Sequence, residues 1–151
     1  MLKRLISSLF APARRQHIRP ADDEANPLVD YFFGNSGPLI HKWHHYLDIY
    51  HRHFSGFRGA SPVVVEIGVS QGGSLRMWRD YFGPGCRIVG IDVDPRCRQF
   101  ADEGIEILIG SQDDREFLAS VRELLPRIDI LIDDGGHPMG QQIATFEELY
   151  R

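Results

Sequence analysis

The chain has 151 residues, 42% of them hydrophobic, and 17 basic against 21 acidic residues give it a net charge of −4. This predicts one globular domain with its own core and excludes disordered and collagen-like classes. No apolar run approaches the roughly 18 residues of a membrane span, and the acidic balance gives no general footprint for nucleic acid. Cys86 and Cys97 show no paired spacing, which favours reduced thiols in a cytoplasmic protein.

Residues 1–30 are predicted to be a basic tail and linker. Residues 1–20 carry five basic residues and no acidic one, and the apolar stretch 5–10 is too short for a secretory signal. We favour a frayed terminal segment over a basic amphipathic tail that contacts a membrane or a partner. Pro20, Pro27 and the acidic run 22–24 indicate an irregular linker up to about Leu28.

Residues 31–60 are predicted to form a helical cap over a neighbouring pocket. An apolar stripe at helical spacing consists of Trp43, Leu47, Tyr50 and Phe54. Gly56 and Gly59 end this helix. A metal cluster of His41, His44 and His45 is the alternative, and we disfavour it because the acidic and cysteine partners of a zinc site are absent nearby.

Residues 61–151 alternate between strand and helix patterns. Strands are predicted at residues 62–67, 87–92, 105–109 and 128–133, and helices at 74–82, 95–101, 113–125 and 138–150. Asp113 is predicted to cap the third helix, with Glu116 as its capping-box partner. The buried face of that helix is predicted to consist of Phe117, Val121 and Leu124. Four such units predict a parallel α/β sheet with helices on both faces, which binds ligands beyond the carboxyl ends of its strands.

The first strand ends in a glycine-rich turn. Because Gly68, Gly72 and Gly73 lack side chains, a ligand can approach the backbone and the free N–H groups of the next helix. The dinucleotide fingerprint G-x-G-x-x-G fails because Ser70 stands two residues after Gly68, which argues against a nicotinamide dehydrogenase. Glu66, before the turn, favours a ligand with a positive group. A tight turn without a ligand is the alternative.

Polar residues follow the second and third strands. Asp92, 24 residues after Gly68, is suited to accept hydrogen bonds from two ribose hydroxyls. The alternative is that Asp92 caps the next helix through the turn at residues 94–95. Ser111 and Gln112 offer polar groups where an adenine edge would lie.

The fourth strand ends in two carboxylates, a glycine pair and a histidine, at residues 133–137. Adjacent carboxylates after an apolar strand are costly unless a positive or hydrogen-bonding group meets them. Asp134 is suited to ligate Mg²⁺, and His137 is suited to accept a proton. A turn with an Asp cap and a solvated histidine remains an equal alternative.

These segments resemble a known family, the class I S-adenosylmethionine-dependent methyltransferases, and within it the metal-dependent sugar O-methyltransferases of the macrocin and mycinamicin type. The resemblance extends over about residues 41–151 and rests on the aromatic helix at 43–54, the turn at 65–75, and residues 77–84, 90–92 and 132–137. It implies a Rossmann-like methyltransferase sheet whose cofactor-binding part is residues 61–151.

The resemblance also implies roles for individual residues. Glu66 and Gly68 would lie by the methionine part of S-adenosylmethionine, with Ser70 and Gly72 in the same turn. Asp92 would hold the ribose, Ser111 and Gln112 would border the adenine, and Asp133 would face the cofactor amino group. Asp134 would ligate Mg²⁺, and His137 would take the proton from the acceptor hydroxyl.

The expected function is therefore a Mg²⁺-dependent O-methyltransferase for a sugar-like or other natural-product hydroxyl. Ser111 stands where many relatives carry Asp, and no acidic pair after a fifth strand is present to complete the metal site. We thus expect a sheet truncated after its fourth strand and helix. Its apolar edge at residues 128–133 predicts aggregation or self-association into a homo-oligomer. The alternatives are a non-catalytic S-adenosylmethionine-binding fragment and a relative that hydroxylates antibiotic nuclei.

Overall fold

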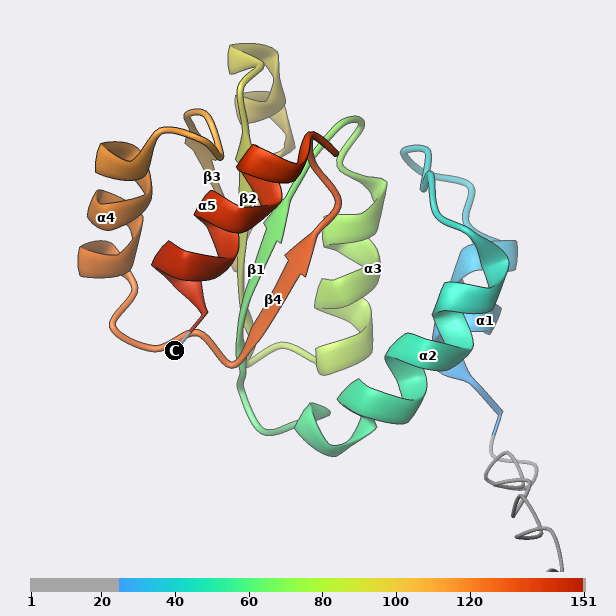
Figure 1. Ribbon diagram of the computed structural model, residues 1–151. Coiled ribbons are helices and arrows are strands. Elements are labelled where there is room, and N and C mark those ends of the chain that lie inside the picture. The colour runs from blue at the N-terminus through green and yellow to red at the C-terminus, as the bar shows by residue number, and fades with distance from the viewer. Residues whose placement is uncertain (1–24, 151) are drawn as a thin grey trace, which may run out of the picture.

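The computed structural model describes residues 25–150, which form a parallel four-stranded sheet with helices on both faces (Figure 1). The strands are β1 Val63–Ile67, β2 Arg87–Asp92, β3 Ile105–Ile109 and β4 Ile130–Asp133. The α-helices are α1 Pro27–Gly34, α2 His44–Phe54, α3 Gly73–Phe82, α4 Arg115–Leu124 and α5 Met139–Leu149. Two 3₁₀ helices span Ser55–Phe57 and Pro95–Phe100. The strand order β3-β2-β1-β4 confirms the predicted parallel α/β sheet.

The sheet separates two hydrophobic cores. Figure 1 shows α3 on one face, with α1 and α2 beyond it, and α4 and α5 on the other face. Val64 of β1 packs with Trp78 and Leu75 of α3, whereas Val65 of β1 packs with Leu118 of α4. Successive side chains of a strand point to opposite faces, so this alternation also decides on which face each polar residue of a strand lies.

The start of the described region corrects one prediction. Helix α1 begins at Pro27, inside the range predicted as tail and linker. The Asn26 side chain accepts a hydrogen bond from the backbone N–H of Leu28 at 3.0 Å, and Leu28 is buried in the core. An Asn cap followed by Pro at the first helical position is a strong helix start, which outweighs the turn tendency of the proline. The predictions for residues 1–24 lie outside the described residues.

Two helix predictions also need correction. Trp43 does not belong to the buried stripe of α2, because the helix begins at His44 and the Trp43 side chain is 72% exposed. The cap of α4 is Asp114, not Asp113, and its side chain accepts hydrogen bonds from the backbone N–H groups of Glu116 and Phe117. Leu124 is accordingly 50% exposed, while Leu118 is buried in its place.

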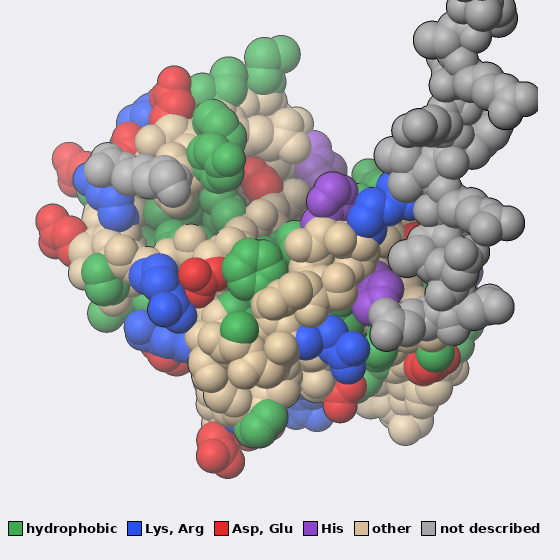
Figure 2. Space-filling model, turned by 90° about the horizontal axis from the view of Figure 1, so that it is seen from below, with side chains coloured by type: hydrophobic (Ala, Val, Ile, Leu, Met, Phe, Trp, Pro, Cys, Tyr) green, Lys and Arg blue, Asp and Glu red, His purple; other side chains and the backbone are tan. Residues whose placement is uncertain are grey.

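On the face of the molecule seen in Figure 2, acidic and basic side chains are interspersed and do not form separate patches. Cys86 and Cys97 are free and buried. Within residues 25–150 no helix is long and apolar enough to cross a membrane.

Among the described strands, β4 pairs only with β1 and so forms one edge of the sheet, next to the exposed side chains of Phe146 and Tyr150.

Candidate functional site

Three adjoining cavities lie at the carboxyl ends of the strands. The strand-end cavity, of about 340 Å³, is lined by Ile67, Gly68, Ser70, Ile91, Asp92, Val93, Gly110, Ser111, Gln112, Asp134, Gly135, Gly136 and Gln141. The central cavity, of about 270 Å³, is lined by Leu39, His41, Lys42, Gly68, Val69, Ser70, Ser74, Asp134, Gly135 and His137. The aromatic cavity, of about 250 Å³, is lined by His41, Lys42, Trp43, Tyr46, Asp134 and His137. Asp134 lines all three, so they are grouped around this residue.

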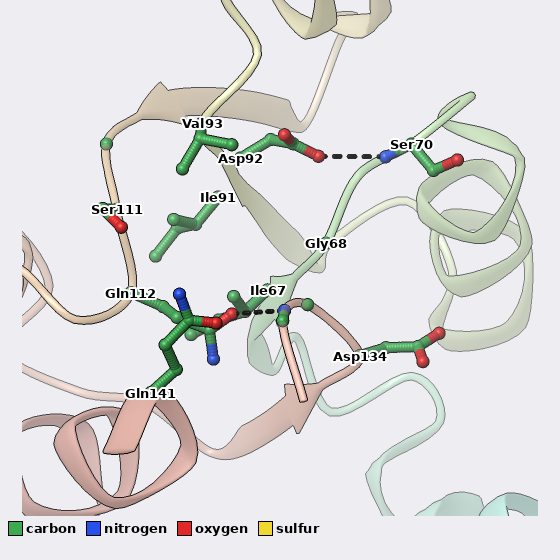
Figure 3. Close-up of a pocket in the computed structure, with 13 residues that line it drawn as sticks. Ile67, Gly68, Ser70, Ile91, Asp92, Val93, Ser111, Gln112, Asp134 and Gln141 are labelled. Atoms are coloured by element: carbon green, nitrogen blue, oxygen red, sulfur yellow. Dashed lines mark hydrogen bonds between the residues drawn. The ribbon is translucent and has the colours of Figure 1, made fainter. Parts of the chain in front are cut away.

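Asp92 fixes the glycine-rich turn at the strand-end cavity. Its Oδ2 accepts hydrogen bonds from the backbone N–H groups of Val69 at 2.9 Å and Ser70 at 3.1 Å, as Figure 3 shows for Ser70. Its Oδ1 accepts from the N–H of Asp94 at 2.9 Å, while Asp94 itself caps the 3₁₀ helix through the N–H of Arg96. A carboxylate has about four acceptor positions, so Asp92 retains capacity toward the cavity.

The glycine-rich turn brings β1 close to the loop after β4. Gly68 has φ +93°, and a Cβ atom at this position would collide with the backbone carbonyl of Asp134. Ser70 also has a positive φ of 50° and presents its backbone to the cavity. Gly72 has a positive φ of 75° as well, and its Cβ would lie 2.6 Å from the Phe100 ring. Gly72 is therefore a packing position and does not line the three cavities.

Gln112 organises the loop after β4. Its Oε1 accepts a hydrogen bond from the backbone N–H of Gly136 at 2.6 Å (Figure 3). Its Nε2 donates to the carboxylate of Asp133 at 3.2 Å and to Thr145 Oγ1 at 3.4 Å. Asp133 therefore faces Gln112 and α5, on the opposite side of the sheet from Glu66, and it does not line the strand-end cavity.

A buried lysine that the sequence analysis overlooked pairs with two predicted site residues. The Lys42 side chain is 2% exposed, and its Nζ lies 2.8 Å from Glu66 Oε1 and 2.7 Å from Asp134 Oδ2. Burial alone would lower the pKa of Lys42, but the charge of Glu66 and the hydrogen bonds to Asp134 and Glu66 outweigh it and raise that pKa. Glu66 is fully buried and also accepts a hydrogen bond from Ser74 Oγ at 2.7 Å. Lys42 is thus the positive partner of Glu66 within the chain, and the expected position of Glu66 by the cofactor stays a prediction.

The histidines before and within α2 have separate surroundings. His44 packs edge-on against the rings of Phe32 and Phe33, and His45 packs against Tyr46. His41 instead lines the central and aromatic cavities together with His137. Among residues 25–150, no group of three His, Cys, Asp or Glu side chains is placed to hold a metal ion. Neither the three-histidine cluster nor a complete site around Asp134 is present in this part of the chain.

The structure gathers most of the predicted site residues. The strand-end cavity is lined by Gly68, Ser70, Asp92, Ser111, Gln112 and Asp134, and the other two cavities by Asp134 and His137. Glu66, Gly72 and Asp133 lie outside these walls. The lining residues that the prediction omitted include Lys42, Gln141 and Tyr46. One signal pointed to Lys42, since Lys3 is the only other lysine in the sequence and Lys42 interrupts an aromatic segment.

Comparisons with known proteins identify relatives of this chain. No protein-family model matches it. It is 40% identical over 115 residues to 8-demethyl-8-(2-methoxy-alpha-L-rhamnosyl)-tetracenomycin-C 3'-O-methyltransferase of Streptomyces olivaceus, a match that covers 72% of this chain and 29% of that protein. It is 36% identical over 115 residues to mycinamicin VI 2''-O-methyltransferase of Micromonospora griseorubida, covering 71% of this chain and 28% of the relative.

A solved structure shows the same fold. The MycE methyltransferase in complex with Mg, SAH and mycinamycin VI matches 87% of this chain and 34% of its own chain, with a TM-score of 0.71 and 30% identity. This chain spans about three tenths of the length of the curated relatives it matches. The resemblance inferred from the sequence is confirmed, as is the Rossmann-like methyltransferase fold. Over the matched region, the chain is homologous to the sugar O-methyltransferases of the macrocin and mycinamicin type.

Proposed function

We propose that the protein binds S-adenosylmethionine in the strand-end and central cavities and is an O-methyltransferase for a hydroxyl of a sugar-like or natural-product acceptor. The observation that carries this proposal is the grouping of the three cavities around Asp134, in a chain related to an enzyme solved with SAH and Mg. The strand-end cavity has the size of a small-molecule site, with apolar walls at Ile67 and Ile91 and polar groups at Asp92 and Ser111.

The residues of the strand-end cavity suit a nucleoside. Asp92 presents a carboxylate held by two backbone N–H groups, which keeps it oriented for ribose hydroxyls. Ile67, Ile91 and Val93 offer apolar surface to a base, and Ser111 and Gln141 offer hydrogen-bonding groups. The absence of a side chain at Gly68 leaves the backbone open between this cavity and the central one. In this arrangement the methionine part of the cofactor extends toward Asp134.

The acceptor is proposed to enter the aromatic cavity. The exposed rings of Trp43 and Tyr46 suit the apolar face of a sugar ring, while Asp134 and His137 suit its hydroxyls. S-adenosylmethionine supplies an electrophilic methyl group, which passes to the acceptor oxygen as the carbon–sulfur bond breaks. His137 is exposed and lines both adjoining cavities, so we assign it the proton of the acceptor hydroxyl. The chain's contribution is mainly the alignment of the two reactants.

Magnesium is part of the proposal because it accompanies SAH in the related structure. The described residues offer one suitable carboxylate, Asp134, whose Oδ2 is held by Lys42. These residues do not by themselves form a magnesium site. The incomplete set of metal ligands favours the second candidate function, in which this chain binds S-adenosylmethionine without turnover.

Calorimetric titration of the 151-residue chain with S-adenosylmethionine tests the first step, and a transfer assay with a glycoside acceptor tests the second. We expect binding, and a product that gains a methyl group and not an oxygen atom, which separates methyl transfer from hydroxylation. The His137→Asn variant should bind the cofactor like the wild type while losing transfer. Binding without any transfer, with and without added Mg²⁺, would favour the second candidate function, and failure to bind would refute both.

The cellular setting is also proposed from the chain's composition and its relatives. We assign a small hydroxylated molecule as partner, a cytoplasmic location and no nucleic-acid partner, since the biosynthetic relatives act on rhamnosyl and macrolide compounds. Self-association along β4 into a homo-oligomer stays a prediction, and sedimentation of the full chain at several concentrations tests it.

A further inference from the structure

Lys42 joins two regions of the fold that are far apart in sequence. It lies between α1 and α2, in the helical segment 27–57, and its ammonium is 92 residues from Asp134, to which it donates a hydrogen bond. The two carboxylates that it contacts come from different strands, Glu66 from β1 and Asp134 from the end of β4. It is the only lysine or arginine among the described residues that line the three cavities.

The two ion pairs of Lys42 differ in their surroundings. Glu66 is fully buried and has a second partner in Ser74, so this pair is part of the core. The side chain of Asp134 is 38% exposed and lines all three cavities. Lys42 holds its Oδ2, whereas Oδ1 has no hydrogen-bond partner within the described residues. The lysine therefore holds one oxygen of Asp134 and leaves the other available to a ligand.

We propose that Lys42 is a positioning residue, which sets the orientation of Asp134 for the cofactor. Cofactor affinity then depends on the packing of the helical segment 27–57 against the sheet. This proposal rests on the proposed function. A carboxylate on a loop with two glycines after it has many accessible rotamers, and a short contact to a buried ammonium selects one of them. Orientation of a binding group by a fixed neighbour is a general requirement of precise sites.

A set of variants separates positioning from simple stability. Lys42→Met leaves Glu66 as an uncompensated buried charge, so we expect a lower Tm as well as weaker cofactor binding. The double variant Lys42→Met with Glu66→Gln removes that charge, so its Tm should return toward the wild type. Asp134 is still unheld in the double variant, and its Kd for S-adenosylmethionine should stay raised by about ten-fold. Lys42→Arg, which keeps the charge, should restore much of the affinity.

The sign of the change in affinity is informative. S-adenosylmethionine carries a net positive charge, so loss of the Lys42 charge alone would tighten its binding. The double variant loses one charge of each sign, so weaker binding than in Glu66→Gln alone reports lost orientation of Asp134. Wild-type or tighter binding by a double variant with restored Tm would overturn the proposal.

A second measurement does not depend on the cofactor. A buried, doubly paired ammonium exchanges its protons slowly, so the ¹⁵Nζ signal of Lys42 should be visible in the folded full chain and absent in Lys42→Arg. Asp134→Asn should shift this signal, whereas His137→Asn, which changes a lining residue with no hydrogen bond or ion pair to Lys42 among the described residues, should leave it nearly unchanged. No response to Asp134→Asn contradicts the proposal. The expected shift in a chain that fails to bind S-adenosylmethionine would instead refute the proposed function alone.

Discussion

The strand-end cavity and the aromatic cavity share Asp134 but are built in different ways. The strand-end cavity is formed by residues that directly follow β1 to β4, and its polar groups are largely satisfied by backbone partners, as with Asp92 and Gln112. The aromatic cavity is formed where the segment before α2 reaches the loop after β4, and it holds Lys42 and two histidines. The first cavity follows from the order of the strands in the sheet, whereas the second depends on a contact between the sheet and the segment before α2.

The largest expected effect comes from Gly68, which stands where the strand-end and central cavities meet. In Gly68→Ala, both the positive φ of +93° and the collision with the Asp134 carbonyl oppose folding, so we expect a loss of about 3 kcal/mol or more. Gly83→Ala is the control, because Gly83 also has a positive φ, +90° with ψ 178°, but open space around its Cβ position, so it should lose only the backbone cost of about 1–3 kcal/mol. Urea unfolding measures both. Equal losses would show that the approach of β1 to the loop after β4 is not tight.

The difference between the cavities explains what the sequence could predict. Parallel strands place their carboxyl ends at one edge, so the positions of Asp92, Ser111 and Gln112 followed from the strand pattern alone. Period-2 alternation places Glu66 and Asp133 on opposite faces of the sheet. The expected pose assigned both to the cofactor, and these two roles stay predictions. The partner of Lys42 was not predictable, because no local pattern indicates that the segment before α2 folds back onto the end of β4.

A second prediction acts on the strand-end cavity only. Asp92→Ala removes a carboxylate that accepts three backbone N–H bonds, and hydrogen bonds to charged groups contribute about 1.5–3 kcal/mol each. We expect the Kd for S-adenosylmethionine to rise about 100-fold, which corresponds to about 2.7 kcal/mol. Asp94→Ala is the control, since Asp94 also accepts a backbone N–H bond but does not line the cavity. Calorimetric titration should find its Kd unchanged. Unchanged binding by Asp92→Ala would refute the assigned pose.

A third prediction concerns pH and the packing behind the same cavity. Burial, with the nearby charge of Asp92, raises the pKa of the Cys97 thiol to about 11, and its Sγ donates to the carbonyl of Ser70 at 3.5 Å. Below about pH 8.5 the thiol is protonated in both the folded and the unfolded chain. As the pH rises toward 11, the unfolded chain releases this proton first, so the free energy of unfolding falls.

The Cys97→Ala variant isolates this contribution from the tyrosines, which titrate in the same range. We expect the wild type to lose on the order of 1 kcal/mol more stability than Cys97→Ala between pH 7 and pH 10. Urea unfolding at the two pH values measures the difference. If the free energy of unfolding falls equally with pH in the two proteins, the Cys97 thiol is not buried against Ser70 as described.

The smallest expected effects come from two adjacent carboxylates, Asp113 at the rim of the strand-end cavity and Asp114 at the start of α4. Asp114 caps α4, so Asp114→Ala should lower the free energy of unfolding by ~0.5–1 kcal/mol without changing the Kd for S-adenosylmethionine. Asp113 accepts hydrogen bonds from Ser111 and Gln141, two residues of the cavity wall. Asp113→Ala should therefore weaken cofactor binding and leave stability nearly unchanged. The opposite pattern, a loss of stability in Asp113→Ala and weaker binding in Asp114→Ala, would show that Asp113 caps α4. The helix would then begin in the register that the capping-box pattern predicts, and Asp113 would not support the cavity wall.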